Sequence, residues 1–139
     1  MATILVCDPH AEVRTLLARV VARLGHEAVF PEEDGGSGFR DARVDVLVIE
    51  PADPRALAAA QILRLEREDI PIVCASIYPP SAHSRRLQPV AYLVKPFALA
   101  ELEAALHAAV ARVGVPARLT GSVARPRSRR PPATSAASS

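Results

Sequence analysis

Five short apolar runs, separated by longer segments, constrain the fold of this chain more than any other feature of its sequence. The four strongest runs cover residues 3–8, 44–50, 70–76 and 90–94, and a shorter one covers residues 27–30. Their apolar residues are mostly continuous rather than alternating. This pattern is typical of strands buried on both faces of a parallel sheet.

Three of the intervening segments carry helix signals. Residues 9–25 place an apolar stripe at helical spacing, with Pro9 where a first helical turn tolerates it and Gly25 as a stop. Residues 51–69 indicate a loop and then an Ala- and Leu-rich helix, and residues 98–114 indicate a final helix. The predicted buried positions of the first and last of these helices are Val13, Leu16, Leu17, Val20, Val21 and Leu24, and Leu99, Leu102, Leu106, Ala109, Val110 and Val113.

The other two connections have weaker signals. Residues 77–89 contain three prolines, so any helix there is short, and a weak helix is predicted around Phe39 to Ala42. The overall order is still a strand followed by a helix, five times over. This order predicts a doubly wound α/β fold, flavodoxin-like, with five parallel strands in the order 2-1-3-4-5 and helices on both faces.

Length and composition predict one cytoplasmic domain. The chain has 139 residues, of which 50% are hydrophobic and 23% are charged, as in globular proteins with a real core. No apolar run approaches the ~18 residues of a membrane-spanning helix. The first residues enter a strand at once, so we expect no signal peptide. Cys7 and Cys74 lie inside apolar runs and are expected to be buried, reduced thiols.

Charge divides the chain near residue 114. Residues 1–114 hold eleven arginines and a single lysine against fifteen acids, a net charge of −3. Residues 115–139 hold five arginines and no acid, a net charge of +5. This second segment also has almost no large apolar residue, so it cannot offset the entropy of ordering. We therefore predict one domain over residues 1–114 and a disordered tail rich in Arg, Pro and Ser over residues 115–139.

Polar side chains stand at the ends of four predicted strands. Asp8 ends the first strand, Glu50 the third, Ser76 the fourth, and Lys95 follows the fifth. In a doubly wound fold, ligands and chemistry gather at the carboxyl ends of the strands. We therefore expect two carboxylates, a hydroxyl and an ammonium group to meet at one edge of the sheet. The ammonium group belongs to the only lysine in the chain.

The segments around these residues resemble a known family. "ILVCDPH", "VDVLVIEP", "IPIVCAS" and "AYLVKPF" occur in the order and at roughly the intervals found in receiver domains of response regulators. The resemblance covers about residues 3 to 113. It implies a stand-alone receiver domain of two-component, phosphorelay signal transduction, because no DNA-binding pattern follows the domain.

The resemblance also implies roles for the strand-end residues. In receiver domains an aspartate after strand 3 accepts a phosphoryl group from a histidine kinase, and acids after strand 1 help to hold Mg²⁺. A hydroxyl after strand 4 and a lysine after strand 5 contact the phosphoryl oxygens. The corresponding residues here are Glu50, Asp8, Ser76 and Lys95, with Tyr92 as the switch aromatic and a Lys95–Pro96 bond that resembles the family's cis peptide.

Two positions depart from the family pattern. The phosphoacceptor position holds Glu50, and the extra methylene of glutamate displaces the carboxylate from the in-line geometry of phosphoryl transfer. The second acidic position after strand 1, a metal ligand in the family, holds Pro9. We therefore predict a degenerate receiver, or pseudo-receiver, that is not an enzyme and is not phosphorylated by the usual route. Its only cofactor would be a weakly held Mg²⁺ at Asp8 and Glu50.

Alternatives stay open for Glu50 and Asp8. Glu50 could be a working phosphoacceptor at an unusual site. Its longer carboxylate could instead reach Lys95 and Ser76 and partly imitate a phosphorylated aspartate, with a charge of about −1 rather than −1.5 to −2. Asp8 could cap the first helix as well as line the pocket.

A small-ligand module is a weaker alternative. The residues "DPH", Asp8 to His10, match the start of the cobalamin-binding motif, which occurs on a similar fold with the histidine as a cobalt ligand. The later glycine of that motif is replaced by Val13, and its glycine-rich segment is missing.

The expected partner is a signalling protein. Its binding face would include the strand-5 edge, the loop before that strand and the final helix, and the sequence does not identify a sensor kinase. The basic residues 125–130 could bind nucleic acid, anionic lipid or an acidic protein. The tail has no aromatic residue for base stacking, so we expect no specific nucleic-acid binding and no membrane span.

Overall fold

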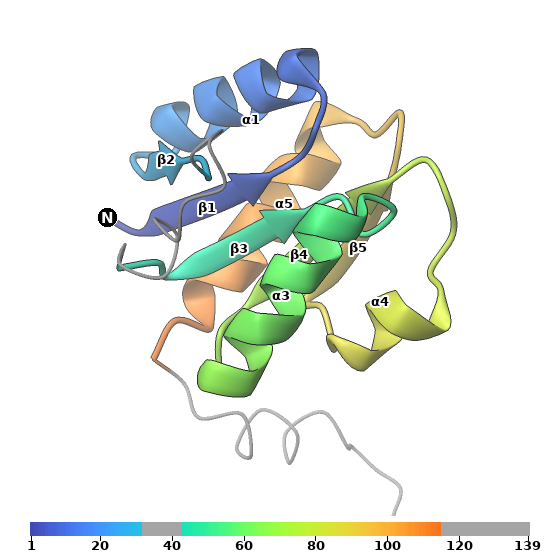
Figure 1. Ribbon diagram of the computed structural model, residues 1–139. Coiled ribbons are helices and arrows are strands. Elements are labelled where there is room, and N and C mark those ends of the chain that lie inside the picture. The colour runs from blue at the N-terminus through green and yellow to red at the C-terminus, as the bar shows by residue number, and fades with distance from the viewer. Residues whose placement is uncertain (32–42, 115–139) are drawn as a thin grey trace, which may run out of the picture.

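A five-stranded parallel sheet with helices on both faces makes up the computed structural model, which describes residues 1–31 and 43–114 (Figure 1). The strands are β1 (Thr3–Cys7), β2 (Glu27–Val29), β3 (Val46–Ile49), β4 (Ile72–Ser76) and β5 (Ala91–Val94). The helices are α1 (Ala11–Arg23), α3 (Pro54–Glu66), α4 (Ala82–Arg86) and α5 (Leu99–Ala111). The strand order β2-β1-β3-β4-β5 confirms the predicted fold. The predicted helix near Phe39 and the predicted tail lie outside the described residues.

The register of the sheet brings the carboxyl ends of the strands to one edge. Cys7 of β1 pairs with Ile49 of β3, and Ile49 in turn pairs with Cys74 of β4. At the far edge, Ser76 of β4 pairs with Val94 of β5. The residues that directly follow β1, β3 and β5 therefore emerge at the same edge of the sheet, as expected for parallel strands.

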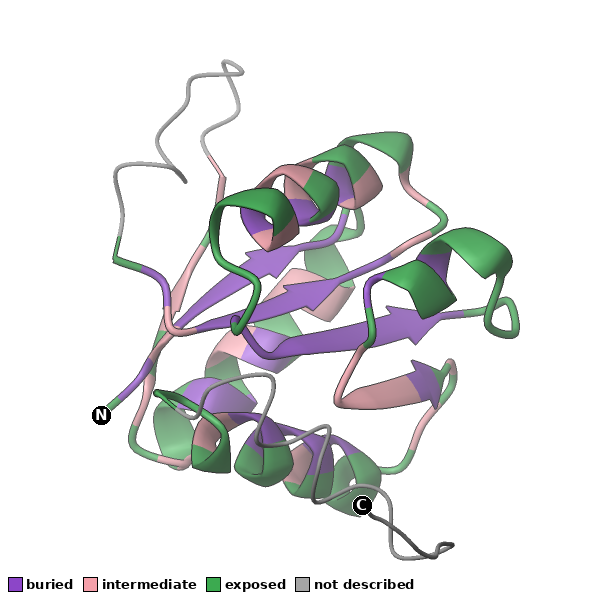
Figure 2. Ribbon diagram, turned by 90° about the horizontal axis from the view of Figure 1, so that it is seen from below, coloured by how far each residue is buried: buried purple, intermediate pink, exposed green. Residues whose placement is uncertain are grey.

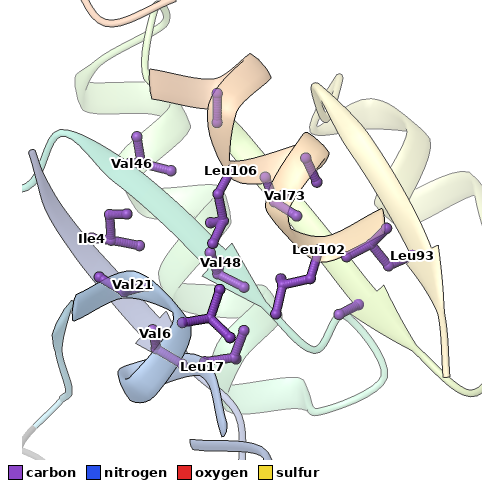
Figure 3. Close-up of a cluster of buried hydrophobic side chains, with 14 residues drawn as sticks. Ile4, Val6, Leu17, Val21, Val46, Val48, Val73, Leu93, Leu102 and Leu106 are labelled. Carbon is purple, nitrogen blue, oxygen red and sulfur yellow. The ribbon is translucent and has the colours of Figure 1, made fainter. Parts of the chain in front are cut away.

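Side chains from the two faces of the sheet form two separate hydrophobic clusters. The first lies under α1 and α5, where Leu17, Val21, Leu102 and Leu106 pack on inward residues of four strands (Figure 3). The second lies under α3, and its strand residues are Leu5, Cys7, Leu47, Ile49, Ile72 and Cys74. Because both faces are covered, β3 and β4 are buried along their whole length and β1 at every residue except Thr3, while the helices keep an exposed side (Figure 2). This burial explains the continuous apolar runs in the sequence.

Helix α1 begins two residues later than a capping Asp8 would require. Its N-cap is His10, whose side chain makes no capping hydrogen bond, and its first residue is Ala11. The alternative in which Asp8 caps this helix is therefore wrong, and Pro9 precedes the helix instead of standing in its first turn. At the other end Gly25 has a φ of 88°, a left-handed conformation that favours glycine, which agrees with its predicted role as a stop.

Three residues predicted to be buried in helices are exposed. Leu16 lies beside Leu17 on α1, but only Leu17 faces the sheet, because consecutive helical residues point about 100° apart. Leu99 is the first residue of α5 and Val113 follows its end, so neither reaches far over the sheet. The apolar stripe on each helix is therefore narrower than the sequence pattern predicts.

Arg64 ties the end of α3 to the segment between α4 and β5. Its guanidinium donates through Nε and one terminal nitrogen to the carbonyl oxygen of Leu87, at 3.1 and 2.6 Å. The other terminal nitrogen donates to the carbonyls of Glu68 and Ile70, at 2.7 and 2.8 Å. The short helix α4, which has only five residues, is held in place by these bonds and by Leu87 in the second cluster.

Candidate functional site

The structure brings three of the four predicted strand-end side chains into direct contact. Asp8 follows β1, Glu50 follows β3 and Lys95 follows β5, so each is placed by a strand whose register is fixed by its neighbours. The Lys95 ammonium nitrogen lies 2.8 Å from Asp8 Oδ2 and 2.9 Å from Glu50 Oε1. The two carboxylates and the ammonium group therefore form one ion triad, which we call the Asp8–Glu50–Lys95 triad.

The triad is largely withdrawn from water. Only 3% of the Asp8 side chain, 5% of Glu50 and 12% of Lys95 remain exposed. Burial by itself lowers the pKa of Lys95, because it penalises the charged form. The hydrogen bonds to Asp8 and then to Glu50 outweigh this effect and leave the pKa of Lys95 above its ordinary value. Lys95 is therefore a firmly protonated cation at neutral pH.

Backbone contacts hold Lys95 at the rim of the sheet. Its amide nitrogen donates to the carbonyl oxygen of Ser76 at 2.8 Å, and the bond between Lys95 and Pro96 is cis, as the family resemblance implies. A lysine suits this position because a compact ammonium can donate to two carboxylates at once, whereas a wide, planar guanidinium needs a different geometry.

Each carboxylate also accepts a backbone hydrogen bond. Asp8 Oδ1 accepts from the amide of His10 at 2.8 Å, and Glu50 Oε2 accepts from the amide of Ala52 at 3.1 Å. These bonds use the oxygens that do not face Lys95, so both ends of each carboxylate are occupied. The charge of Glu50 also acts on the buried thiol of Cys74, where burial first and this carboxylate second raise the pKa to about 12.

Ser76 and Tyr92 lie at the same edge but bond elsewhere. The Ser76 side chain is fully buried, and its hydroxyl oxygen accepts from the amide of Tyr78 at 3.2 Å. The Tyr92 hydroxyl donates to the carbonyl oxygen of Tyr78 at 2.7 Å, and burial raises its pKa. Within the described residues, no hydrogen bond joins the Ser76 hydroxyl to Glu50 or Lys95. The contact between Glu50 and Ser76 that phosphate imitation would use is therefore not made.

The residues at this edge are a poor fit for Mg²⁺. In the described part of the chain, no group of three or more His, Cys, Asp or Glu side chains is placed to hold a metal ion. Asp8 and Glu50 supply two carboxylates, but the Lys95 ammonium lies between them, and Pro9 offers no side-chain ligand. A divalent cation there would have to displace the ammonium group and work with two protein ligands.

One contact of the site was missed by sequence reasoning. The His10 ring nitrogen Nδ1 lies 3.1 Å from Asp8 Oδ1, so His10 is attached to the triad through Asp8. In the sequence, His10 stands out only as part of a cobalamin-like motif. Its spacing of two residues from a strand-end acid is the signal that could have pointed to this contact.

Arg14 of α1 also contacts this turn. Its guanidinium donates to the Asp8 carbonyl oxygen at 2.9 Å. This bond places a second positive charge next to the Asp8–His10 turn, and it was not predicted from the sequence.

Solved structures define the class to which this fold belongs. The structure is similar to the response regulator TrrA of Thermotoga maritima, solved with Mg²⁺ and BeF, with a TM-score of 0.66 and 25% identity over 77% of this chain and 97% of that chain. It is similar to the chemotaxis response regulator CheY4 of Vibrio cholerae, with a TM-score of 0.67 and 19% identity over 77% and 97% of the two chains. An orphan response regulator of H. pylori matches with a TM-score of 0.65 and 19% identity over 78% and 96%.

This chain therefore has the fold of a response regulator receiver domain. No protein-family model matches the sequence, and no curated protein matches it either. No helix in the described residues is long and apolar enough to cross a membrane.

Proposed function

We propose that this chain is a receiver module of signal transduction that works without a phosphoryl group on Glu50 and acts by binding another signalling protein. The observation that carries the proposal is the Asp8–Glu50–Lys95 triad, in which a single ammonium group bonds both carboxylates at 2.8 and 2.9 Å. The proposed module is not an enzyme and needs no cofactor.

The triad opposes phosphorylation at Glu50. Attack on a phosphoryl donor through Oε1 would weaken the bond of Glu50 to Lys95, and attack through Oε2 would weaken its bond to the Ala52 amide. The donor phosphate would then approach two buried carboxylates whose charges only one lysine offsets. Mg²⁺ normally neutralises such charge during phosphoryl transfer, and the residues here hold it poorly. Each of these factors raises the barrier to transfer.

The contact between Glu50 and Lys95 supports part of the imitation hypothesis. In receiver domains the lysine contacts the phosphoryl group, and here the same lysine contacts the carboxylate at the acceptor position. The Ser76 hydroxyl does not take part, so Glu50 reproduces one of the two contacts. We infer that the module rests in one state whose lysine is already engaged, and that it does not switch by phosphorylation.

The partner surface that we propose lies around the edge strand β5. Ile77 and Tyr78 in the loop before α4, Val94 on β5 and Leu99 at the start of α5 are all exposed large hydrophobic residues. The short helix α4 leaves this edge less covered than a longer helix would. A signalling partner that buries these side chains would gain apolar contact area.

Incubation with acetyl phosphate and Mg²⁺, followed by intact-mass measurement, tests the proposal. The expected result is no Mg²⁺-dependent acyl phosphate on the wild-type protein. A matched variant with Pro9→Asp and Glu50→Asp restores both family residues, and it is expected to form the adduct. An acyl phosphate at Glu50 of the wild type, dependent on Mg²⁺, would overturn the proposal and support a working phosphoacceptor instead.

A further inference from the structure

An exposed histidine beside the Asp8–Glu50–Lys95 triad is held by a buried carboxylate. His10 Nδ1 lies 3.1 Å from Asp8 Oδ1, and the Asp8 side chain is 3% exposed while that of His10 is 67% exposed. The same Asp8 oxygen accepts from the His10 amide at 2.8 Å, which fixes the turn that carries the ring. The two residues thus form a dyad with one buried and one accessible member.

The dyad fixes which ring nitrogen of His10 carries the proton. An ionised carboxylate can only accept hydrogen bonds, so the nitrogen that faces Asp8 must be the donor. In the neutral ring the proton is then on Nδ1, and Nε2 keeps a free electron pair. Lys95 bonds the other oxygen of Asp8 at 2.8 Å, so the orientation of this carboxylate is fixed.

A fixed imidazole with an accessible free electron pair is a nucleophile. Carboxylates orient histidines in this way in enzymes that use the imidazole as a base or a nucleophile. The guanidinium of Arg14, bonded to the Asp8 carbonyl oxygen at 2.9 Å, adds a cation beside the same turn. Cations of this kind attract phosphoryl groups and stabilise them.

We propose that His10 is a phosphoryl-acceptor site, with Asp8 as its positioning residue, for small donors that carry a phosphoryl group on nitrogen. The inference rests on the proposed function, since the triad that blocks Glu50 is what holds Asp8 in place. The phosphoryl group would then be carried by a histidine beside the Asp8–Glu50–Lys95 triad, and Glu50 would remain unmodified.

The transfer step balances without a metal ion or an oxidant. With phosphoramidate as donor, the phosphorus–nitrogen bond of the donor breaks and ammonia leaves with the bonding electrons. A bond forms between phosphorus and His10 Nε2. The positive charge that appears on the ring remains on Nδ1–H, where the Asp8 carboxylate stabilises it. No proton has to leave the ring.

Phosphoramidate treatment of the intact chain tests this inference. The adduct that forms fastest is expected on His10, as located by peptide mapping, and it should survive alkali, as phosphohistidine does. An acyl phosphate on a carboxylate would be lost in alkali. His10→Asn should remove the adduct, whereas His107→Asn, which changes an exposed histidine on α5, should leave it in place.

A second variant tests the role of Asp8. Asp8→Asn keeps the shape of the side chain but removes its charge, and it should slow adduct formation roughly tenfold, the usual scale for a hydrogen bond to a charged group. Circular dichroism and unfolding curves of the variant show whether it is folded. If Asp8→Asn is unfolded, the test is the rate of adduct formation at His10, His83 and His107 of the wild type. The inference requires that the rate at His10 is the highest.

The outcomes separate this inference from the proposed function. Absence of an adduct on His10, or equal rates on His10, His83 and His107, would overturn the inference and leave the proposed function intact. An alkali-labile adduct on Glu50 would instead contradict the proposed function.

Discussion

Lys95 offsets one of two buried negative charges, and no other side chain in the described residues forms an ion pair with Glu50. Taking two carboxylates out of water is costly unless a cation and hydrogen bonds compensate them. Here one ammonium group and the amides of His10 and Ala52 do so. The stability of the strand ends therefore depends on a single side chain.

Replacing Lys95 with methionine should destabilise the protein strongly. Lys95→Met keeps an unbranched side chain, one atom shorter, but leaves Asp8 and Glu50 buried without a counter-charge, and the expected loss is about 3–5 kcal/mol of unfolding free energy. Urea unfolding at neutral pH measures it. Adding Asp8→Asn and Glu50→Gln to Lys95→Met removes both uncompensated charges and should restore part of the loss. A loss below about 1 kcal/mol, the value of an exposed ion pair, would contradict the buried triad.

The two buried cysteines should make the fold less stable at alkaline pH. Burial, with a smaller contribution from nearby carboxylates, raises the pKa of Cys7 and of Cys74 from 9.0 to about 12. Above about pH 9 the unfolded chain loses these protons and the folded chain keeps them. The unfolded state then binds fewer protons, so stability falls as pH rises, by up to about 1.4 kcal/mol per pH unit for each thiol.

Unfolding curves between pH 8 and 11, with reducing agent present, measure this decline. In a variant with Cys7→Ala and Cys74→Ala, the unfolding free energy should fall less steeply with pH from about pH 9 onward. Lys95 acts in the same direction at higher pH. Its pKa is raised in the fold, so its contribution is complete below the ordinary lysine pKa of about 10.4 and is lost as pH rises through the folded value. Equal slopes for both proteins near pH 9 to 10 would refute the role of the thiols.

At the scale of elements, α4 depends on α3 for its position. The Arg64 guanidinium bonds the carbonyl oxygens of Leu87, Glu68 and Ile70, which lie in two different connections. Its pKa is lowered by burial, with a smaller opposing effect of Asp69, which agrees with a guanidinium partly withdrawn from water. One residue of α3 thus fixes the segment that leads into the edge strand β5.

Arg64→Lys should loosen this segment. A lysine cannot reproduce the fork of donors, so at least one of the three carbonyls loses its partner, and the expected loss is about 1–3 kcal/mol of unfolding free energy. Amide hydrogen exchange should become faster from Arg85 to Val90, where α4 leads into β5. The control is Arg55→Lys at the exposed start of the same helix, which should change neither quantity. Unchanged exchange in Arg64→Lys would show that the hydrophobic contacts of Leu87 suffice.

At the scale of the whole molecule, the sequence predicts the parallel sheet well and the helix surfaces less well. Continuous apolar runs indicate strands that are buried on both faces of the sheet. The pairing of these strands then sets which residues lie opposite one another. Leu16, Leu99 and Val113 were misplaced because helical spacing alone does not say how wide a face the sheet covers. Helix ends depend on local hydrogen bonds, which is why the start of α1 was also misplaced.

The candidate site, too, could be predicted only in part from the sequence. The meeting of Asp8, Glu50 and Lys95 follows from three strand ends on one edge, and the sequence predicted it. The orientation of short polar side chains does not follow from topology. The Ser76 hydroxyl bonds to the Tyr78 amide, and the His10 ring bonds to Asp8, for reasons of local geometry that no periodicity encodes.

The ammonium group of Lys95 offers the most direct measurement, because the chain contains a single lysine. Labelling lysine with ¹⁵N gives one side-chain nitrogen signal, and its titration by NMR reports the pKa of the triad's cation without overlap. We predict that this signal titrates above the ordinary lysine value of about 10.4 and that it exchanges slowly with water. Titration at or below that value, with fast exchange, would show that the nitrogen is free in solvent and that the Asp8–Glu50–Lys95 triad is not formed.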